Sequence, residues 1–155
     1  TEIYTLSLHD ALPILSRHRV RHLIIGGMAF IYHAKPRFTK DIDIWVDPAP
    51  RNIDRANRAL AEFGSPAFLE KGDPDQILQI GVAPNRADLL LSAPGLSFAL
   101  AWKGRIEGKY GRAPALWIGL DSLLAIKEAI PAPRHQEDAR VLRDVKRLQA
   151  RKARR

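Results

Sequence analysis

The chain has 155 residues, of which 46% are hydrophobic and 27% charged, which suits one compact globular domain and excludes wholesale disorder. It contains no cysteine, so disulfide frameworks, zinc ribbons and thiol catalysis are excluded and a reducing, cytoplasmic location is expected. Its 25 Lys and Arg residues exceed its 17 Asp and Glu residues, giving a net charge of +8, and this balance favours a nucleic acid or nucleotide partner over a membrane.

The first fourteen residues are expected to lie outside the fold. They read TEIYTLSLHDALPI, have no clear helical or strand period, and are interrupted by Pro13. The segment resembles one reading frame of a widely used short-read sequencing adaptor, so we predict a non-native peptide that packs poorly. Residues 15–155 would then form a single domain, with a core at about residues 19–120 and C-terminal helices at about residues 121–153.

The rest of the chain alternates between strand-like and helix-like patterns. Strands are expected over residues 19–27, 41–47, 76–82 and 86–91, with a weaker β segment over 105–120. Helices are expected over residues 28–35, 48–63, 95–102, 122–130 and 137–153. Asp121 is the predicted N-cap of the fourth helix, and Pro131 and Pro133 are predicted to separate it from the fifth. This alternation predicts an α/β (α+β) fold, with helices packed on a short mixed sheet.

Three acidic residues on predicted strands are candidate metal ligands. Asp41 and Asp43 share one face of a strand, about 6.6 Å apart, while Ile42 and Ile44 point into the core. Hard cations such as Mg²⁺ prefer oxygen ligands of this kind, although two ordinary solvent-facing acids would give the same pattern. Asp88 lies on another apolar strand, where an ionised carboxylate needs either a shared metal or a base such as Arg86.

Gly26 and Gly27 follow an apolar strand and precede a helix. Without side chains they allow backbone N–H groups to approach a phosphate at the helix N-terminus. A simple tight turn is the alternative, and a glycine pair alone favours that alternative.

The segment GGMAFIYHAKPRFTKDIDIWV resembles the signature of the DNA polymerase β-like nucleotidyltransferase superfamily, and most resembles the branch of AbiEii-type toxins and related bacterial nucleotidyltransferases. The matching positions are Gly26, Gly27, Ala29, His33, Arg37, Thr39, Asp41 and Asp43. The later RADLL segment around Asp88 resembles the third carboxylate strand of that superfamily. A weaker resemblance links Lys127, Arg134 and Asp138 to a C-terminal K…R…D pattern.

The resemblance implies a minimal nucleotidyltransferase fold with a C-terminal helical segment. It also implies an enzyme that moves a nucleoside monophosphate from a nucleoside triphosphate (NTP) to an acceptor. Asp41 and Asp43 would hold two Mg²⁺ ions about 3.5–4 Å apart, and Asp88 would bind the catalytic ion and help activate the acceptor hydroxyl. Gly26 and Gly27 would clasp the NTP, and Lys127 is a further candidate for the site.

Three other positions in the signature have two interpretations each. His33 either faces the active site or is satisfied locally on its helix. Arg37 either contacts the triphosphate, which suits its guanidinium, or is a solvated loop residue. Thr39 either hydrogen-bonds a phosphate or metal ligand, or is an ordinary β-forming residue. Lys40 is expected to point away from the site, and Trp45 to pack in the core or at the rim.

The basic C-terminal segment RDVKRLQARKARR would suit tRNA or another RNA acceptor, or would simply be a solvated helix end. Our leading hypothesis is a metal-dependent bacterial nucleotidyltransferase, serving as the toxin of a toxin–antitoxin pair with a cognate antitoxin protein. The alternatives are a nucleotidyltransferase acting on a small molecule such as an antibiotic, an antitoxin that adenylylates its partner, and a catalytically inactive RNA-binding or interaction module on the same fold.

Overall fold

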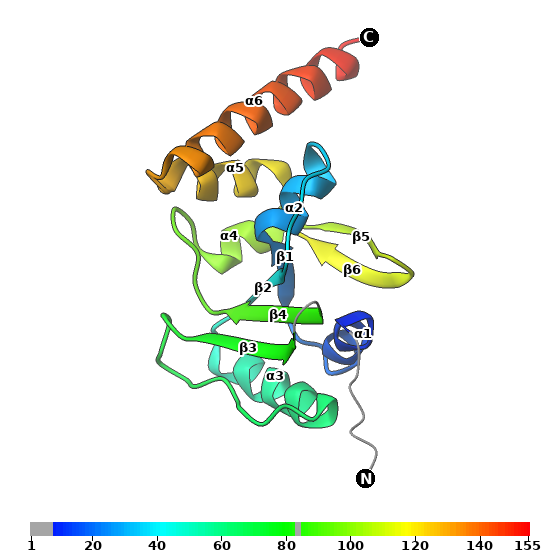
Figure 1. Ribbon diagram of the computed structural model, residues 1–155, viewed down its shortest axis with the longest axis vertical. Coiled ribbons are helices and arrows are strands. Elements are labelled where there is room, and N and C mark those ends of the chain that lie inside the picture. The colour runs from blue at the N-terminus through cyan, green and yellow to red at the C-terminus, as the bar shows by residue number, and fades with distance from the viewer. Residues whose placement is uncertain (1–7, 83–84) are drawn as a thin grey trace.

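The computed structural model describes residues 8–82 and 85–155. Within these residues, six strands form one mixed sheet in the order β3-β4-β2-β1-β6-β5 (Figure 1). The strands are β1 (His22–Ile25), β2 (Ile42–Val46), β3 (Ile77–Val82), β4 (Asn85–Leu90), β5 (Ile106–Tyr110) and β6 (Ala113–Trp117). The helices are α1 (Leu8–Arg17), α2 (Gly26–His33), α3 (Pro50–Phe63), α4 (Phe98–Lys103), α5 (Leu120–Ala129) and α6 (Pro133–Ala153). The predicted α/β fold with a mixed sheet is therefore confirmed.

The centre of the sheet brings together segments that are far apart in the sequence. Strand β2 pairs antiparallel with β1 and parallel with β4. Ile42 and Ile44 are buried, as the alternating pattern predicted. Asp43 lies level with Ile25 of β1 on one side and with Asp88 of β4 on the other. The acidic residues thus lie at the middle of the sheet.

Helix α3 has the predicted amphipathic pattern and the predicted end. Ile53, Ala56, Ala59 and Leu60 are buried along one face. Gly64 follows the helix with φ of 86°, the left-handed conformation that glycine adopts most readily. Its N–H donates to carbonyl oxygens of the last turn of α3.

Helix α1 corrects the expectation that residues 1–14 stay outside the fold. Residues 1–7 lie outside the described residues, but residues 8–14 form most of a helix that packs against α3, β4 and β6. Leu12 is fully buried, and Ala11, Ile14 and Leu15 are nearly so. Pro13 removes one helical hydrogen bond without ending the helix. The prediction of poor packing is wrong for this part because its apolar residues do follow helical spacing.

The C-terminal helices begin earlier than expected. Gly119, not Asp121, occupies the N-cap of α5, and the Asp121 carboxylate instead pairs with Lys146 at 3.0 Å. Pro133 begins α6 rather than separating it from the preceding chain, because the first turn of a helix tolerates proline. The Pro84–Asn85 pair predicts a turn between the strands expected over residues 76–82 and 86–91, and Pro84 lies outside the described residues.

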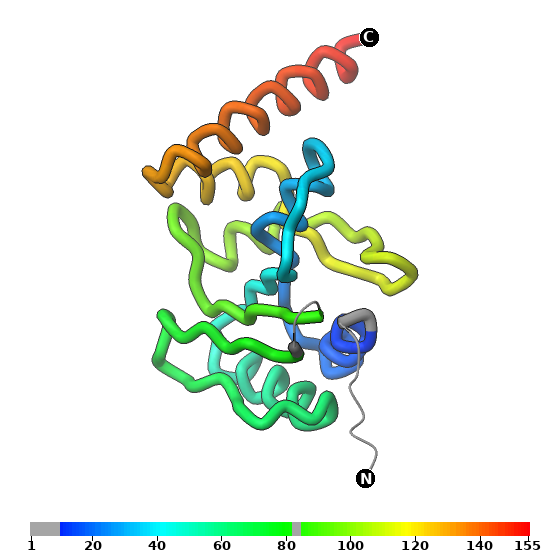
Figure 2. Tube along the Cα trace, in the orientation of Figure 1, coloured from blue at the N-terminus to red at the C-terminus, as the bar shows by residue number. Residues whose placement is uncertain are grey.

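Helix α6 packs on α5 through Ala139 and Leu142 and then runs on beyond it (Figure 2). From Lys146 to Arg155 every residue is exposed. Within the described part of the chain, none of the helices has the length and apolar character required to cross a membrane.

Candidate active site

A pocket of about 480 Å³ lies between the centre of the sheet, the start of α2 and the start of α6. Its volume falls within the roughly 300–1,000 Å³ typical of small-molecule sites. The lining residues are Gly26, Gly27, Arg37, Phe38, Thr39, Lys40, Asp41, Asp43, Asp88, Lys127, Arg134 and His135. The pocket therefore combines three acidic side chains with several cationic ones and the glycine pair.

Asp43 and Asp88 are register partners on neighbouring parallel strands, so their side chains lie side by side on one face of the sheet. Burial, followed by the charges of Asp88 and Asp41, raises the pKa of Asp43 to about 6, and Lys127 acts in the opposite direction. Asp88 Oδ1 is buried and has no hydrogen-bond partner in the described structure. A bound cation would relieve this crowding of carboxylates, so the donor set fits a divalent metal.

Asp41 precedes β2, and its Oδ2 accepts a hydrogen bond of 2.8 Å from Arg86. From the sequence, Arg86 is a candidate partner of Asp88, but Ala87 is in register with Ile42, and this places Arg86 level with Asp41. In this arrangement, no group of three or more His, Asp or Glu side chains among residues 8–82 and 85–155 is positioned to hold a metal ion. Ligation of one ion by all three carboxylates would require these side chains to move closer together.

The glycine pair is needed for two close contacts as well as for its free N–H groups. Helix α2 begins at Gly26 itself, so both glycines belong to the first turn, where backbone N–H groups have no helical acceptor. Gly26 has φ of +68°, and a Cβ there would lie 2.1 Å from Asp43 Oδ2. A Cβ on Gly27 would lie 2.8 Å from Thr39 Oγ1. Glycine therefore lets Asp43 and Thr39 pack directly against the backbone at the start of α2.

Arg37 lines the pocket, but its guanidinium is held by other partners. Nη1 donates to Asp138 Oδ1 at 2.7 Å, and the guanidinium carbon lies 4.1 Å from the centre of the Phe30 ring. Arg37 is therefore not a solvated loop residue, because its side chain tethers the segment before β2 to α6, and its contact with a triphosphate stays a prediction. The pairing partner is 101 residues away in the chain, beyond the reach of any local pattern.

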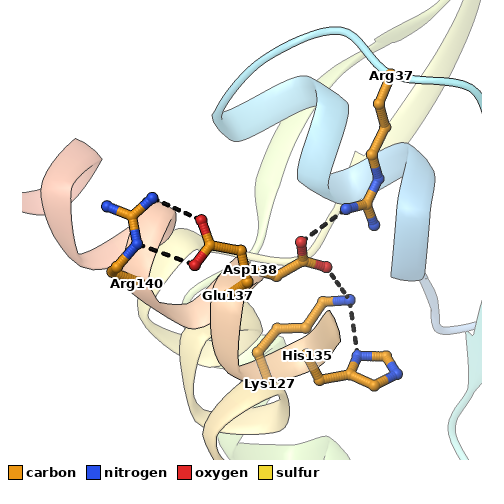
Figure 3. A network of polar contacts seen from close by, with 6 residues as sticks. All are labelled: Arg37, Lys127, His135, Glu137, Asp138 and Arg140. Carbon is orange, nitrogen blue, oxygen red and sulfur yellow. Dashed lines mark hydrogen bonds and ion pairs between the residues drawn. The ribbon is translucent and has the colours of Figure 1, made fainter. Parts of the chain in front are cut away.

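Lys127 and Asp138 form a buried pair beside the pocket (Figure 3). Lys127 Nζ lies 2.9 Å from Asp138 Oδ2 and 3.1 Å from His135 Nδ1, and only 5% of the Lys127 side chain is exposed. Burial acts to raise the pKa of Asp138, but the contacts with Arg37 and Lys127 outweigh it and lower that pKa. The weak K…R…D resemblance thus corresponds to residues that meet: Lys127 and Arg134 line the pocket, and Asp138 holds Lys127.

His33 does not line the pocket. Its Nε2 lies 2.7 Å from the Ile118 carbonyl oxygen, and its ring packs edge-on against Tyr32. The partner of His33 is thus a carbonyl 85 residues away in the chain, and not a group on its own helix. The Trp45 ring is buried against Phe98, as expected of a core residue.

Three residues that line the pocket are not among those predicted from the sequence. Lys40 lines it, although it was expected to point away, and Phe38 and His135 were not singled out. Phe38 and Lys40 could have been found from their position within the RFTKD segment. His135 could not, because only the turn between α5 and α6 brings it to Lys127.

No protein-family model and no curated protein matches this chain. Among solved structures, a Thermotoga maritima protein, TM1012, provisionally assigned as a nucleotidyltransferase, aligns with a TM-score of 0.58 over 88% of each chain at 15% identity. ANT(2″)-Ia, solved in complex with adenylyl-2″-tobramycin, aligns with a TM-score of 0.57 over 92% of each chain at 19% identity. At this level of identity the comparisons establish the fold alone, and the fold of this chain is that of nucleotidyltransferases.

Proposed function

We propose that the protein is a metal-dependent nucleotidyltransferase that moves a nucleoside monophosphate from an NTP to a hydroxyl acceptor and releases pyrophosphate. The observation that carries this proposal is the placement of Asp43 and Asp88 side by side, in one pocket with Asp41 and the Gly26–Gly27 turn.

The cationic groups of the pocket suit a triphosphate. Gly26 and Gly27, at the start of α2, line the pocket, so the positive end of the helix dipole lies beside it. Helix N-termini bind phosphate in this way. Lys127 of α5 and Arg134 of α6 also line the pocket and would balance the remaining phosphate charge. The nucleotide would thus lie between the glycine turn and the C-terminal helices.

The acidic groups suit the reacting end of the nucleotide. Asp43 and Asp88 would hold Mg²⁺ together with Asp41, which has only one oxygen bound to Arg86. When bound, Mg²⁺ would neutralise charge on the phosphates and favour attack at the α-phosphorus. Asp88, with one buried oxygen lacking a partner, is the best placed group to take the proton from the acceptor hydroxyl.

The test is pyrophosphate release from each NTP with Mg²⁺. Asp43→Asn and Asp88→Asn should each lower the rate at least about 100-fold, because an amide keeps the shape and loses the ligand charge. Asp73→Asn, at an exposed loop carboxylate, is the matched control and should leave the rate unchanged. If wild type releases no pyrophosphate with any acceptor, and Mg²⁺ plus NTP does not raise its melting temperature, the enzyme proposal fails and an inactive binding module becomes the better interpretation.

For the acceptor we propose tRNA, with the protein acting as the toxin of a toxin–antitoxin pair. The support is the exposed end of α6, where Arg151, Lys152, Arg154 and Arg155 project beyond the body of the protein. A labelled NTP incubated with bulk tRNA should transfer label to the RNA. Label on a protein in an extract would instead favour the partner-adenylylating alternative.

A small-molecule acceptor is the second candidate, favoured by the shared fold with ANT(2″)-Ia, whose structure holds an adenylylated aminoglycoside. A panel of aminoglycosides tested in the same assay separates the two. Label on an aminoglycoside and none on tRNA would support this second candidate.

A further inference from the structure

Phe38 is an exposed aromatic residue on the wall of the candidate active site. With 80% of its surface accessible, it is the most exposed of the large apolar residues in the described structure. It lines the same pocket as the three carboxylates and the glycine pair. Covering such a ring would contribute on the order of 2 kcal/mol, so its exposure beside a polar pocket leaves a binding surface available.

The residues on either side fix the direction of Phe38. Arg37 is bound to Asp138 of α6 and lies over the Phe30 ring, as Figure 3 shows for the ion pair. Thr39 packs against Gly27 at the start of α2. Both neighbours therefore face the protein, whereas the Phe38 ring between them is exposed. The backbone at Phe38 is thus held on both sides, by Arg37 and by Thr39, while its ring remains in contact with solvent.

The surroundings of Phe38 match the chemistry of a nucleotide. Lys40 and Arg134 line the same pocket and offer charges for phosphate. Phe38 is three residues from Asp41, and three residues span at most about 11 Å. One pocket thus holds an aromatic ring, cationic side chains and the carboxylate cluster, at separations that one or two nucleotides can span.

We propose that Phe38 is the stacking face for a nucleobase, with Lys40 contacting the adjoining phosphate. This inference rests on the proposed function and names how the site recognises its substrate. The base could belong to the NTP or to the end of an RNA acceptor, since both present the same flat aromatic surface, and a stacked ring is tolerant of base identity.

Equilibrium binding to Phe38→Ala and Phe38→Trp tests the proposal with four probes in the presence of Mg²⁺. The probes are ATP, inorganic tripolyphosphate, a short single-stranded RNA, and an oligonucleotide of equal length with abasic sites. Phe38→Ala should weaken ATP or RNA binding at least about 5-fold, the lower end of measured base–aromatic stacking. Tripolyphosphate and abasic binding should not change, and Phe38→Trp should restore affinity. Phe68→Ala, at an exposed phenylalanine outside the pocket, is the matched control.

The outcomes separate the two proposals. Weaker ATP binding assigns the base to the NTP, and weaker RNA binding assigns it to the acceptor; either supports stacking. If wild type binds ATP or RNA and Phe38→Ala binds them equally well, or if tripolyphosphate and abasic probes are weakened to the same degree, the role of Phe38 is overturned while the proposed function stands. If wild type binds none of the four probes, both proposals fail.

Discussion

Gly26 and Gly64 both have positive φ, yet only Gly26 has a close neighbour. A Cβ on Gly26 would meet the Asp43 carboxylate at 2.1 Å, whereas nothing lies within 4 Å of a Cβ on Gly64. An alanine at position 64 would therefore suffer backbone strain alone, whereas an alanine at position 26 would also clash with Asp43.

Gly26→Ala should destabilise the protein by clearly more than Gly64→Ala. Gly64→Ala should cost about 1 kcal/mol, the penalty of a left-handed alanine, whereas Gly26→Ala also displaces Asp43. Urea unfolding of both variants measures the difference. Equal losses of stability would mean that Asp43 moves aside at no cost.

Asp43 should make the metal-free protein less stable as pH rises. Its pKa is about 6 in the folded state, against 3.8 for an ordinary aspartate side chain, so the folded state binds a proton more tightly than the unfolded state does. The free energy of unfolding should therefore fall by at most about 3 kcal/mol between about pH 4 and pH 6 and stay constant above that range. Asp43→Asn should lack this loss, and Mg²⁺ should reduce it in wild type.

The measurement is the difference in unfolding free energy between wild type and Asp43→Asn across pH, without divalent cations. Taking a difference cancels the opposite contribution of His22, whose pKa is lowered because burial disfavours the imidazolium. Asp73→Asn serves as the control carboxylate. A difference that is constant from pH 4 to pH 7 would contradict the raised pKa.

At the scale of elements, α1 is part of the core. Leu12 is fully buried, and Arg17 and His18 at the end of the helix contact Glu62 of α3. Leu12→Ala should cost about 2–5 kcal/mol in unfolding free energy, as expected of a buried leucine. Leu148→Ala, at an exposed leucine of α6, should cost little. If Leu12→Ala is equally harmless, the original expectation of a peptide outside the fold is reinstated.

Helix α6 is held to the site by the Lys127–Asp138 pair. Asp138→Leu should destabilise the protein by about 3–5 kcal/mol because it leaves Lys127 buried without its counter-charge. Replacing both, as Lys127→Met with Asp138→Leu, should recover much of the loss. Chemical denaturation of the single and double variants forms the cycle. Additive losses in the double variant would show that the pair is not coupled.

At the scale of the whole molecule, the excess positive charge extends well beyond the pocket. Replacing Arg151, Lys152, Arg154 and Arg155 with serine should leave the fold intact, since all four are exposed. If the end of α6 binds RNA, the slope of log affinity against log salt should fall by up to about 3, at about 0.7 per phosphate contact. Titration of labelled tRNA at several salt concentrations measures the slope. An unchanged slope would place RNA binding elsewhere.

Local patterns in the sequence were sufficient for most of the sheet and for the acidic side of the site. The alternation in DIDIWV fixed which residues of β2 face the core, and an acid on an apolar strand identified Asp88 as a residue needing a partner. The glycine pair was found by its position between a strand and a helix. These features are predictable because strand and helix periods decide locally which face each side chain takes.

Contacts between distant residues were decided only by the tertiary structure. Arg37 pairs with Asp138, His33 meets the Ile118 carbonyl, and Arg86 binds Asp41 rather than Asp88. Each partner lies 45 to 101 residues away in the chain. A charged or polar side chain specifies only that it needs a partner when partly buried, and packing of the elements chooses which one it reaches.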